Sequence, residues 1–376
     1  MKNKIIHIIN DLRRGGTNNC FFKLLKSSKE KEIIICLNKK GYYLEKFIDM
    51  GHQVYYLDVS SKLSLLKSIL KIFEVLQKEN KSYLHCWLYK SCIFGSIVSM
   101  IFGNKKIIWN IRHSDVNFKF KNFKKHLTIR LCIIISNIKN INLIFNSYNS
   151  MFAHVEIGIK SNNIQVINNG FDTDLFKYLD KKEEFLKNYN IDKNSFILSM
   201  YARFHPIKNH FILFEAISII SKEFNNIHLF LAGNDISNAN IKLKKILNYF
   251  NLGNKTTLAG LLDEGELIKA YSSSDLTILT SNSESFPNVI GESMSCSTPC
   301  LSFDVGDSKR LIGKNGWVTK TNNLYELVKT LRTAITFSKK KDKWKKLKNE
   351  CHCHIKKFYS KENEFLEYQK FYEKLI

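Results

Sequence analysis

The sequence predicts an α/β protein with two doubly wound domains, and three observations point to this class. Its 376 residues exceed the length of one ordinary domain. Short apolar runs alternate with stretches in which apolar residues recur about every 3.6 positions, such as "HFILFEAISIISKEF" (210–224). The apolar runs lack polar alternation, which is typical of parallel strands that helices cover on both faces. Two such series in one chain predict two domains.

The predicted strands fall into two series. The first series comprises residues 4–9, 32–37, 53–58, 83–88, 106–111, 142–147 and 164–169. The second series comprises residues 196–202, 227–233, 256–260, 276–281 and 298–303. Because the stretch between the series is polar, we predict an N-terminal domain over 1–170, a linker region over 171–195, a C-terminal domain over 196–355 and a final helical segment over 356–376.

The formal net charge of +24 is unevenly distributed. Residues 1–170 contain 27 Lys and Arg against 10 Asp and Glu, whereas the rest of the chain contains 31 against 24. A basic first half predicts an anionic partner on that side, which would be a phosphate group, a lipid surface or nucleic acid. A lysine-rich, simply solvated surface is the alternative interpretation, and it does not account for the asymmetry.

Two features bear on the compartment. The longest apolar run, at residues 92–103, is shorter than the roughly 18 residues that span a bilayer, and the N-terminus has the pattern of a first strand, not that of a signal peptide. Nine cysteines occur without a C-x-x-C pair. Both features favour a reduced cytoplasm.

Ligands of open parallel sheets bind where strands end and loops lead into helices. In "NDLRRGGTNNCFF" (10–22), Gly15 and Gly16 would let the backbone approach a ligand, and a helix beginning near Thr17 would offer free N–H groups to an anion. In "NIRHSDV" (110–116), His113 follows another strand. Either loop could equally be an ordinary polar turn.

The loop "YARFHPIKNH" (201–210) follows the first strand of the second series. Arg203 and Lys208 flank Pro206, so a guanidinium and an ammonium could hold a diphosphate from two directions. A solvated basic loop is the alternative.

The stretch "ESFPNVIGE" (284–292) combines a proline with two carboxylates. Pro287 is predicted at the first helical position, where its missing N–H costs nothing. An anion site would then be formed by the amides of Asn288, Val289 and Ile290. Glu284 would lie on the loop and Glu292 more than a turn inside the helix, on either side of a bound anion. Carboxylates so placed suit the hydroxyl groups of a sugar or ribose.

Several of these stretches resemble one enzyme family. "ESFPNVIGESM" followed by "STPCLSFDVGDSKRLI" is similar to the E-x7-E signature of the retaining glycosyltransferases of family 4, the group 1 glycosyltransferases, usually E-G-F-P-N-x-x-x-E-A-M. "YARFHPIKNH" resembles the Arg-and-Lys segment of that family, and "FNSYNSMFAHVEIGIKSNNIQVINNGFDTDLF" (145–176) its domain-crossing segment. "CWLYKSCIFG" with "IWNIRHSD" resembles members that act in bacterial surface polysaccharide assembly.

The resemblance implies a GT-B architecture of two Rossmann-like domains facing a cleft, with the acceptor on the first domain, the sugar nucleotide on the second, and the final segment 356–376 crossing back. It assigns Arg203 and Lys208 to the donor diphosphate, Glu284 to the transferred sugar and Glu292 to the ribose.

The resemblance also places Gly15 and Gly16 on the donor side of the first domain and turns His113 toward the reacting sugar. Ser285, Ser293 and Ala202 depart from the usual Gly, Ala and Gly. All three residues are small, so the resemblance still implies an intact site. The departures therefore bear on the choice of donor.

The implied activity is that of a retaining, metal-independent hexosyltransferase. It would use a UDP- or GDP-sugar and a lipid-linked or lipopolysaccharide-type acceptor at the inner face of the cytoplasmic membrane. The alternatives are a GT-B sugar-nucleotide 2-epimerase and a non-catalytic protein that binds nucleic acid or other anions. We predict no metal site, because "DTD" (172–174) suits a turn and "CHCH" (351–354) a helix surface. The basic-aromatic stretch 117–130 favours anionic lipid over nucleic acid, for which no binding module is recognisable, and a solvated face is the alternative interpretation.

Overall fold

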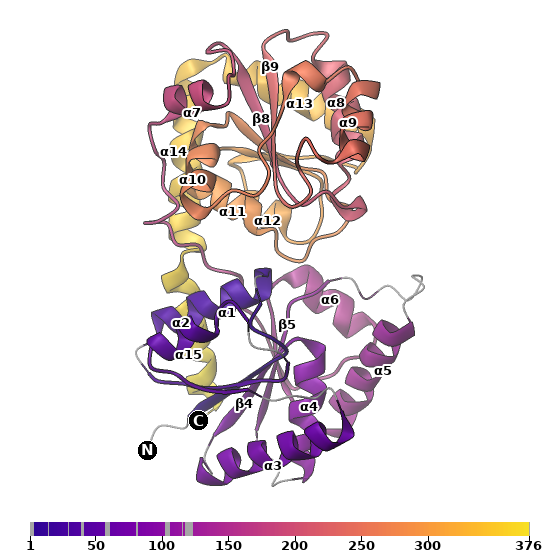
Figure 1. Cartoon of the computed structure of the whole chain (residues 1–376), viewed down its shortest axis with the longest axis vertical. Coiled ribbons are helices and arrows are strands. Elements are labelled where there is room, and N and C mark those ends of the chain that lie inside the picture. Colours follow the sequence, from indigo (N-terminus) through magenta and orange to yellow (C-terminus); the bar gives the residue numbers. More distant parts are fainter. Residues whose placement is uncertain are drawn as a thin grey trace. The chain divides into compact units, whose positions relative to one another are not determined.

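The computed structural model describes residues 4–13, 15–28, 30–38, 41–56, 61–79, 82–101, 106–114, 116 and 123–375. The chain forms two compact units, the first comprising Met1–Gly170 with Lys361–Ile376 and the second Phe171–Ser360. Each unit contains one parallel sheet with helices on both faces (Figure 1), which confirms the predicted α/β class.

The first unit has a seven-stranded sheet in the order β3-β2-β1-β4-β5-β6-β7. Its strands are β1 (Ile5–Ile9), β2 (Ile33–Cys36), β3 (Gln53–Tyr56), β4 (Tyr83–Trp87), β5 (Ile107–Ile111), β6 (Asn142–Phe145) and β7 (Asn163–Val166). One face packs against α1 (Gly16–Ser27), α2 (Leu44–Asp49) and α15 (Lys361–Leu375). The other face packs against α3 (Lys62–Lys78), α4 (Leu88–Ile101), α5 (Phe123–Ile138) and α6 (Tyr148–Glu156). These strands are predominantly apolar because both faces of the sheet are covered.

The second unit has a six-stranded sheet in the order β10-β9-β8-β11-β12-β13. Its strands are β8 (Phe196–Tyr201), β9 (Ile227–Ala232), β10 (Thr256–Leu258), β11 (Leu276–Leu279), β12 (Cys300–Ser302) and β13 (Gly316–Val318). Its α-helices are α7 (Lys182–Asn188), α8 (His210–Ile220), α9 (Ile241–Tyr249), α10 (Glu264–Ser273), α11 (Asn288–Ser295), α12 (Ser308–Ile312), α13 (Leu324–Ser338) and α14 (Lys341–Phe358). Two short 3₁₀ turns, η1 (Pro206–Lys208) and η2 (Gly253–Lys255), precede α8 and β10.

Two predicted boundaries differ from the structure. The segment 171–195, predicted as a linker region, belongs to the second unit, because Phe176, Phe185 and Ile191 are buried in a core cluster with Tyr271. The final segment begins at Lys361 and not at 356, because α14 continues to Phe358 within the second unit.

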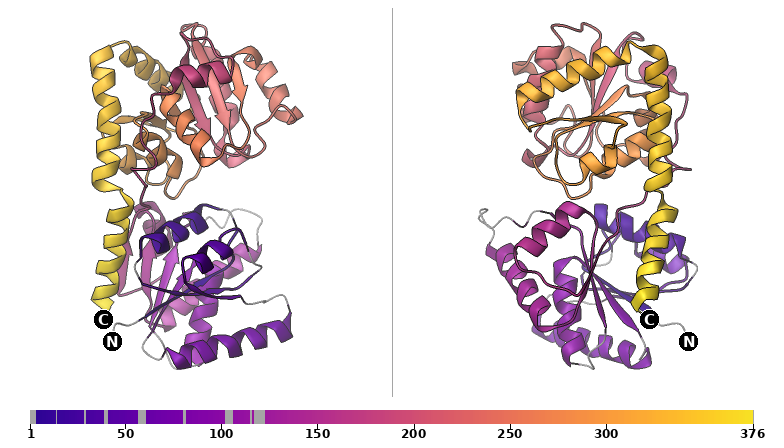
Figure 2. Two further views of the ribbon diagram at one scale, coloured as in Figure 1. Left: turned by 60° about the vertical axis from the view of Figure 1, so that its left-hand side comes forward. Right: turned by 180° about the vertical axis from the view of Figure 1, so that it is seen from behind.

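Helix α15 returns to the first unit and runs along it (Figure 2). The phenol of Tyr368 accepts a hydrogen bond of 2.8 Å from the Asn110 amide, both groups being buried. The Glu364 carboxylate accepts one of 2.9 Å from the backbone N–H of Gly170, the last residue before the second unit. Burial raises the pKa of Glu364 to about 7. Polar as well as apolar contacts therefore anchor this helix.

Within the described residues, none of the helices combines the length and the apolarity needed to cross a bilayer.

Candidate active site

The second unit brings two predicted loops together because β8 and β11 are neighbours in its sheet. The chain leaves this pair of strands in opposite directions, which makes their carboxyl ends the switch point where ligands bind in such sheets. The Thr280 hydroxyl, just after β11, donates to the carbonyls of Lys208 and Asn209 at 3.2 Å each. The N–H of Asn282 donates to the carbonyl of Ile207 at 2.8 Å. The loops after β8 and β11 are thus held together.

Lys208 and Glu284 form an ion pair at this junction. Lys208 Nζ lies 2.5 Å from Glu284 Oε1, and the two side chains are only 21% and 15% exposed. The sequence assigned them to different parts of a donor and gave no sign that they touch. Lys208 ends the short turn η1, and Asn209 follows it in the left-handed conformation with φ 53°. This tight turn aims the ammonium at the loop of Glu284.

The backbone beside Glu284 is fixed by a glycine. Gly306 has φ +56°, and a Cβ at this position would lie 2.4 Å from the carbonyl oxygen of Ser285 and 2.6 Å from that of Glu284. The N–H of Asp307 donates to the Ser285 carbonyl at 3.0 Å. Only glycine permits both this φ and this close approach.

Arg203 is exposed directly after β8. Its guanidinium forms no hydrogen bond or ion pair with the residues that the structure describes. The backbone here is also set by a glycine, since a Cβ on Gly233 (φ +144°) would lie 2.4 Å from the Ala202 carbonyl oxygen. The Arg203 guanidinium therefore projects into solvent from a fixed backbone and can bind an anion.

Helix α11 begins at Asn288, one residue later than predicted, and Pro287 is its N-cap with φ −79° and ψ 96°. The N–H of Ile290 donates to the carbonyl of Pro287 at 3.1 Å. This i→i+3 bond closes the first turn, so Ile290 is not the open donor that the sequence predicted. Asn288 and Val289 are the first two helical residues.

Glu292 is the fifth residue of α11, as predicted more than one turn inside the helix. Its Oε2 accepts a hydrogen bond of 3.1 Å from the hydroxyl of Tyr271 on α10. Burial and the Glu292 carboxylate both raise the pKa of Tyr271, which keeps the phenol protonated as a donor. Sequence reasoning missed Tyr271, because no motif links it to Glu292.

The first unit carries the other predicted residues. Gly15 is the N-cap of α1 and Gly16 its first residue, one position before the predicted start. A Cβ on either would meet no atom of the described residues within 4 Å, so packing against those residues does not require glycine. His113 is exposed after β5; its carbonyl accepts a 2.6 Å hydrogen bond from Ser150 Oγ, and its ring centroid lies 5.9 Å from that of Tyr89.

His113 lines a pocket of about 350 Å³ within the first unit. Asn10 and Tyr89, which follow β1 and β4, also line it, so it lies at the switch point of this sheet. The described lining includes three lysines and no acidic residue. These lysines are Lys90, Lys124 and Lys125. Such a lining suits an anionic group. Residues 117–122 of the predicted basic-aromatic stretch, and Asp115, lie outside the described residues.

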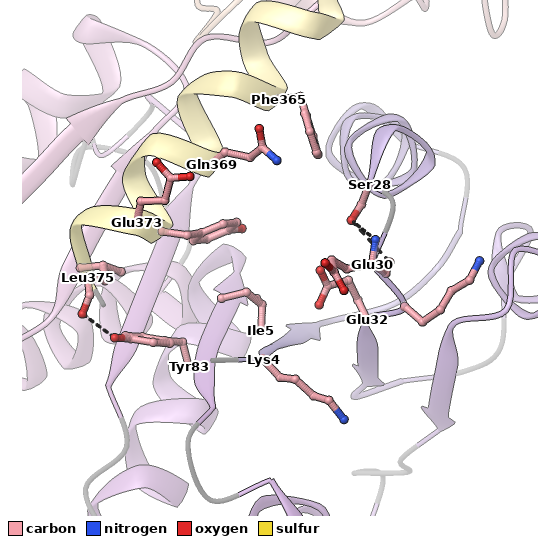
Figure 3. Close-up of a pocket in the computed structure, with 12 residues that line it drawn as sticks. Lys4, Ile5, Ser28, Glu30, Glu32, Tyr83, Phe365, Gln369, Glu373 and Leu375 are labelled. Atoms are coloured by element: carbon pink, nitrogen blue, oxygen red, sulfur yellow. Dashed lines mark hydrogen bonds between the residues drawn. The ribbon is translucent and has the colours of Figure 1, made fainter. Parts of the chain in front are cut away.

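A second pocket of the first unit, about 240 Å³, lies where α15 packs beside the starts of β1 and β2 (Figure 3). Phe365, Gln369 and Glu373 of α15 line one side, and the hydroxyl of Tyr83 donates to the carbonyl of Leu375 nearby. None of the sequence-predicted site residues lines this pocket.

Among the described residues, no group of three or more His, Cys, Asp or Glu side chains is arranged to hold a metal ion. Within the "CHCH" stretch, His352 Nδ1 and His354 Nε2 instead contact the backbone carbonyls of Ser295 and Leu311, at 2.6 and 3.0 Å. Cys351 is buried and Cys353 is exposed, so one side of this part of α14 packs against the second unit and the other side lies at the surface, where the sequence predicted the whole stretch.

Two parallel-sheet units with cations and carboxylates at a strand switch point have the architecture of GT-B glycosyltransferases. Residues 181–350 match the family model "Glycosyl transferases group 1". This match lies within the second unit, which therefore resembles a group 1 glycosyl transferase domain.

Similar proteins agree with this assignment. The chain is 23% identical over 328 residues, 82% of its length and 81% of the relative's, to the UDP-Gal:alpha-D-GlcNAc-diphosphoundecaprenol alpha-1,3-galactosyltransferase of Escherichia coli. It is 25% identical over 264 residues, 68% of its length and 69% of the relative's, to the capsular polysaccharide biosynthesis glycosyltransferase CapH of Staphylococcus aureus. The crystal structure of Anabaena Alr3699/HepE in complex with UDP superposes with a TM-score of 0.85 at 19% identity, covering 99% of this chain and 100% of the other.

Proposed function

We propose that this protein is a retaining, metal-independent glycosyltransferase. It transfers a hexose from a UDP- or GDP-sugar to a hydroxyl of a lipid-linked or lipopolysaccharide-type glycan in bacterial surface polysaccharide biosynthesis. The observation that carries the proposal is the Lys208–Glu284 ion pair at the switch point of the second sheet. Its two loops also carry Arg203 and lead into α11, and they lie in the part of the chain that matches the group 1 family model.

The donor is assigned by the chemistry of these groups. Arg203 and Lys208 meet the two phosphates, Glu284 accepts hydrogen bonds from the transferred sugar, and Glu292 accepts them from the ribose. The similar Anabaena protein was crystallised with UDP and with UDP-glucose, which supports a sugar nucleotide as the donor here.

In the reaction, the bond between the anomeric carbon and the diphosphate oxygen breaks, and its electron pair leaves with the nucleoside diphosphate. The acceptor hydroxyl forms the new bond on the same face of the sugar, and its proton passes to the departing phosphate. Because negative charge grows on that phosphate, Arg203 and Lys208 stabilise the transition state more than the bound donor. The roles of Gly15, Gly16 and His113 stay predictions from the family resemblance.

The acceptor is assigned from the relatives and the first unit. The E. coli relative is named for a diphosphoundecaprenol-linked acceptor and the S. aureus relative for capsular polysaccharide. The basic pocket beside His113 suits the phosphate groups of such an acceptor. A lipid-linked acceptor places the enzyme at the inner face of the cytoplasmic membrane, where nucleotide sugars are available.

A donor panel tests the proposal. The purified chain is incubated with UDP- and GDP-sugars, and we expect one of them to raise the thermal midpoint and to be hydrolysed slowly to the nucleoside diphosphate. The Arg203→Ala variant should lose the hydrolysis. Isomerisation of the sugar nucleotide without release of nucleoside diphosphate would instead establish the epimerase alternative.

Chelation tests the metal-free mechanism. Two cationic side chains meet the leaving diphosphate in this mechanism, so we expect EDTA to change turnover by less than about twofold. In a metal-dependent enzyme, the metal would contribute several kcal/mol of transition-state stabilisation, which EDTA would remove. Activity that EDTA abolishes and Mn²⁺ restores would contradict this part of the proposal.

A further inference from the structure

Helix α5 exposes an apolar stripe to solvent. Leu127, Leu131, Ile134 and Ile138 are 39–74% exposed. Their spacing of four, three and four residues puts all four on one face of the helix. The opposite face, with buried Cys132, packs on the sheet. Exposed large apolar residues are ordinary when scattered, but a continuous stripe needs a partner.

Helices α3 and α4 expose similar residues. Leu63, Leu66 and Leu70 on α3 are each more than half exposed and lie three and four residues apart. Ile97, Met100 and Ile101 are 43–60% exposed at the end of α4. Both helices are therefore apolar on the outer side as well as on the side that faces the sheet.

These three helices form one layer. The same core cluster takes buried side chains from all three, and α4 contacts both α3 and α5. Figure 1 shows them on one side of the first sheet, with α15 on the other. The ten exposed side chains thus belong to the outer surface of a single layer, here named the α3–α5 face.

The charges on this face are predominantly positive. Helices α4 and α5 contain no acidic residue, and α3 contains one, Glu74, which pairs with Lys71 at 2.9 Å. The basic residues of the layer include Lys67, Lys71, Lys78, Lys90, Lys124, Lys125 and Arg130. Apolar side chains flanked by basic ones fit a surface with an apolar interior and anionic headgroups.

We propose that the α3–α5 face docks the protein on an anionic lipid bilayer, with its aliphatic side chains inserted at the level of the headgroups. This proposal rests on the proposed function, because a lipid-linked acceptor requires an enzyme that works at a bilayer. A second copy of this chain is the less suitable occupant, since two faces of the same positive charge would repel each other.

The position of the pocket supports this orientation. Lys124 and Lys125, in the first turn of α5, line the basic pocket beside His113, and the apolar stripe begins at Leu127 in the next turn. A lipid-linked acceptor whose chain stays in the bilayer would therefore present its phosphate near the pocket.

Vesicle sedimentation tests the proposal. The full chain is mixed with vesicles of phosphatidylcholine alone or with 30% phosphatidylglycerol. The α5 double variant Ile134→Ser with Ile138→Ser should lower partition onto the anionic vesicles at least tenfold. The matched control is Ile241→Ser with Leu261→Ser, which removes two equally exposed aliphatic side chains from the second unit and should leave partition unchanged.

The charges are tested separately. Lys67→Gln with Arg130→Gln should weaken partition roughly fivefold per charge at low salt and reduce its salt dependence. The control Lys242→Gln with Lys244→Gln on α9 should not. Equal binding of wild type and the α5 variant would overturn the proposal. So would a dimer in sedimentation velocity that the α5 variant converts to monomer while vesicle binding persists.

A soluble acceptor separates this inference from the proposed function. With a short-chain, water-soluble lipid-diphosphate acceptor and no vesicles, the α5 variant should retain full turnover. With vesicle-embedded acceptor its turnover should fall at least tenfold. If neither protein transfers sugar but wild type alone binds vesicles, the docking surface stands and the proposed activity fails.

Discussion

The two units have the same strand arrangement around their switch points but build the carboxyl edges of their sheets differently. In the second unit, Lys208 and Glu284 are paired, their loops are cross-linked, and glycines at 233 and 306 fix the backbone. In the first unit, Gly15 and Gly16 face open space and His113 is exposed beside a basic pocket. The family model matches only residues within the second unit. We infer that the fixed backbone of the second unit suits the diphosphate that all sugar-nucleotide donors share. The less constrained edge of the first unit suits adaptation to one acceptor.

The largest expected effect is at the cations of the second unit. Arg203→Ala and Lys208→Ala should each lower kcat by about 10²–10³, because each removes a charge-assisted donor from a developing oxyanion. Glu292→Ala should mainly raise the donor KM, since its ribose contact does not change during the reaction. Steady-state kinetics with the donor varied measures both. If Arg203→Ala raises only KM while Glu292→Ala lowers only kcat, the assigned roles are reversed.

The next effect tests whether the second-unit site depends on a fixed backbone. Gly306→Ala would place a methyl group 2.4 Å from the Ser285 carbonyl oxygen at a positive φ, so we expect a loss of about 3 kcal/mol in stability and about tenfold in kcat. Gly265→Ala in α10 is the control, because its Cβ would meet nothing closer than Asp263 Oδ1 at 3.5 Å. That control should be neutral or slightly stabilising. Unchanged kinetics in a stable Gly306→Ala protein would mean that the Glu284 loop is not held as described.

Most of the fold could be predicted from the sequence because buried parallel strands are predominantly apolar runs without regular polar alternation. The strand that was missed, β13 (Gly316–Val318), begins with a glycine and is flanked by polar residues, so its apolar signal does not separate it from a turn. The segment 171–195 was mistaken for a linker because its charged residues outnumber its buried ones. Phe176, Phe185 and Ile191 are nevertheless enough to anchor it in the second core. Polarity along a sequence does not show which few side chains point inward.

The candidate site was predicted in part. The loops after β8 and β11 carry unusual residue combinations, and for that reason the sequence singles out Arg203, Lys208, Glu284 and Glu292, whose roles stay predictions. The contact between Lys208 and Glu284 spans 76 residues and leaves no local signal. Tyr271 was missed because its contact with Glu292 also leaves no local signal. The hydrogen bond from the Ile290 N–H to the Pro287 carbonyl was missed because the helix starts one residue later than predicted.

A smaller expected effect concerns the first unit, whose stability should depend on pH through Glu364. The pKa of Glu364, about 7, lies above that of an unfolded glutamate, so the folded state binds more protons between about pH 4.5 and 7 and stability falls as pH rises through that window. Glu364→Gln stays neutral, and its amide oxygen can accept from Gly170 N–H. The free energy of unfolding of this variant should equal that of wild type at pH 4 and exceed it by on the order of 2 kcal/mol at pH 8. Calorimetric midpoints at both pH values measure this. The positive charge of Arg112 acts against burial by lowering the pKa of Glu364, and a variant less stable at pH 8 would show that this attraction outweighs burial.

The smallest expected effect sharpens the description of the second unit. Tyr271→Phe removes the hydroxyl that donates to Glu292, which leaves the carboxylate less well oriented for a ribose. A hydrogen bond to a charged group contributes about 1.5–3 kcal/mol, and Glu292 keeps other contacts that compensate for part of this loss. We therefore expect the donor KM to rise by about threefold to tenfold with kcat unchanged. Tyr201→Phe is the matched control. Its ring centroid lies 4.3 Å from that of Tyr271 and its hydroxyl bonds to Ser274 at 2.9 Å, so it should lower stability without changing KM. If both variants raise KM equally, the effect comes from packing around α10, and Tyr271 does not position Glu292.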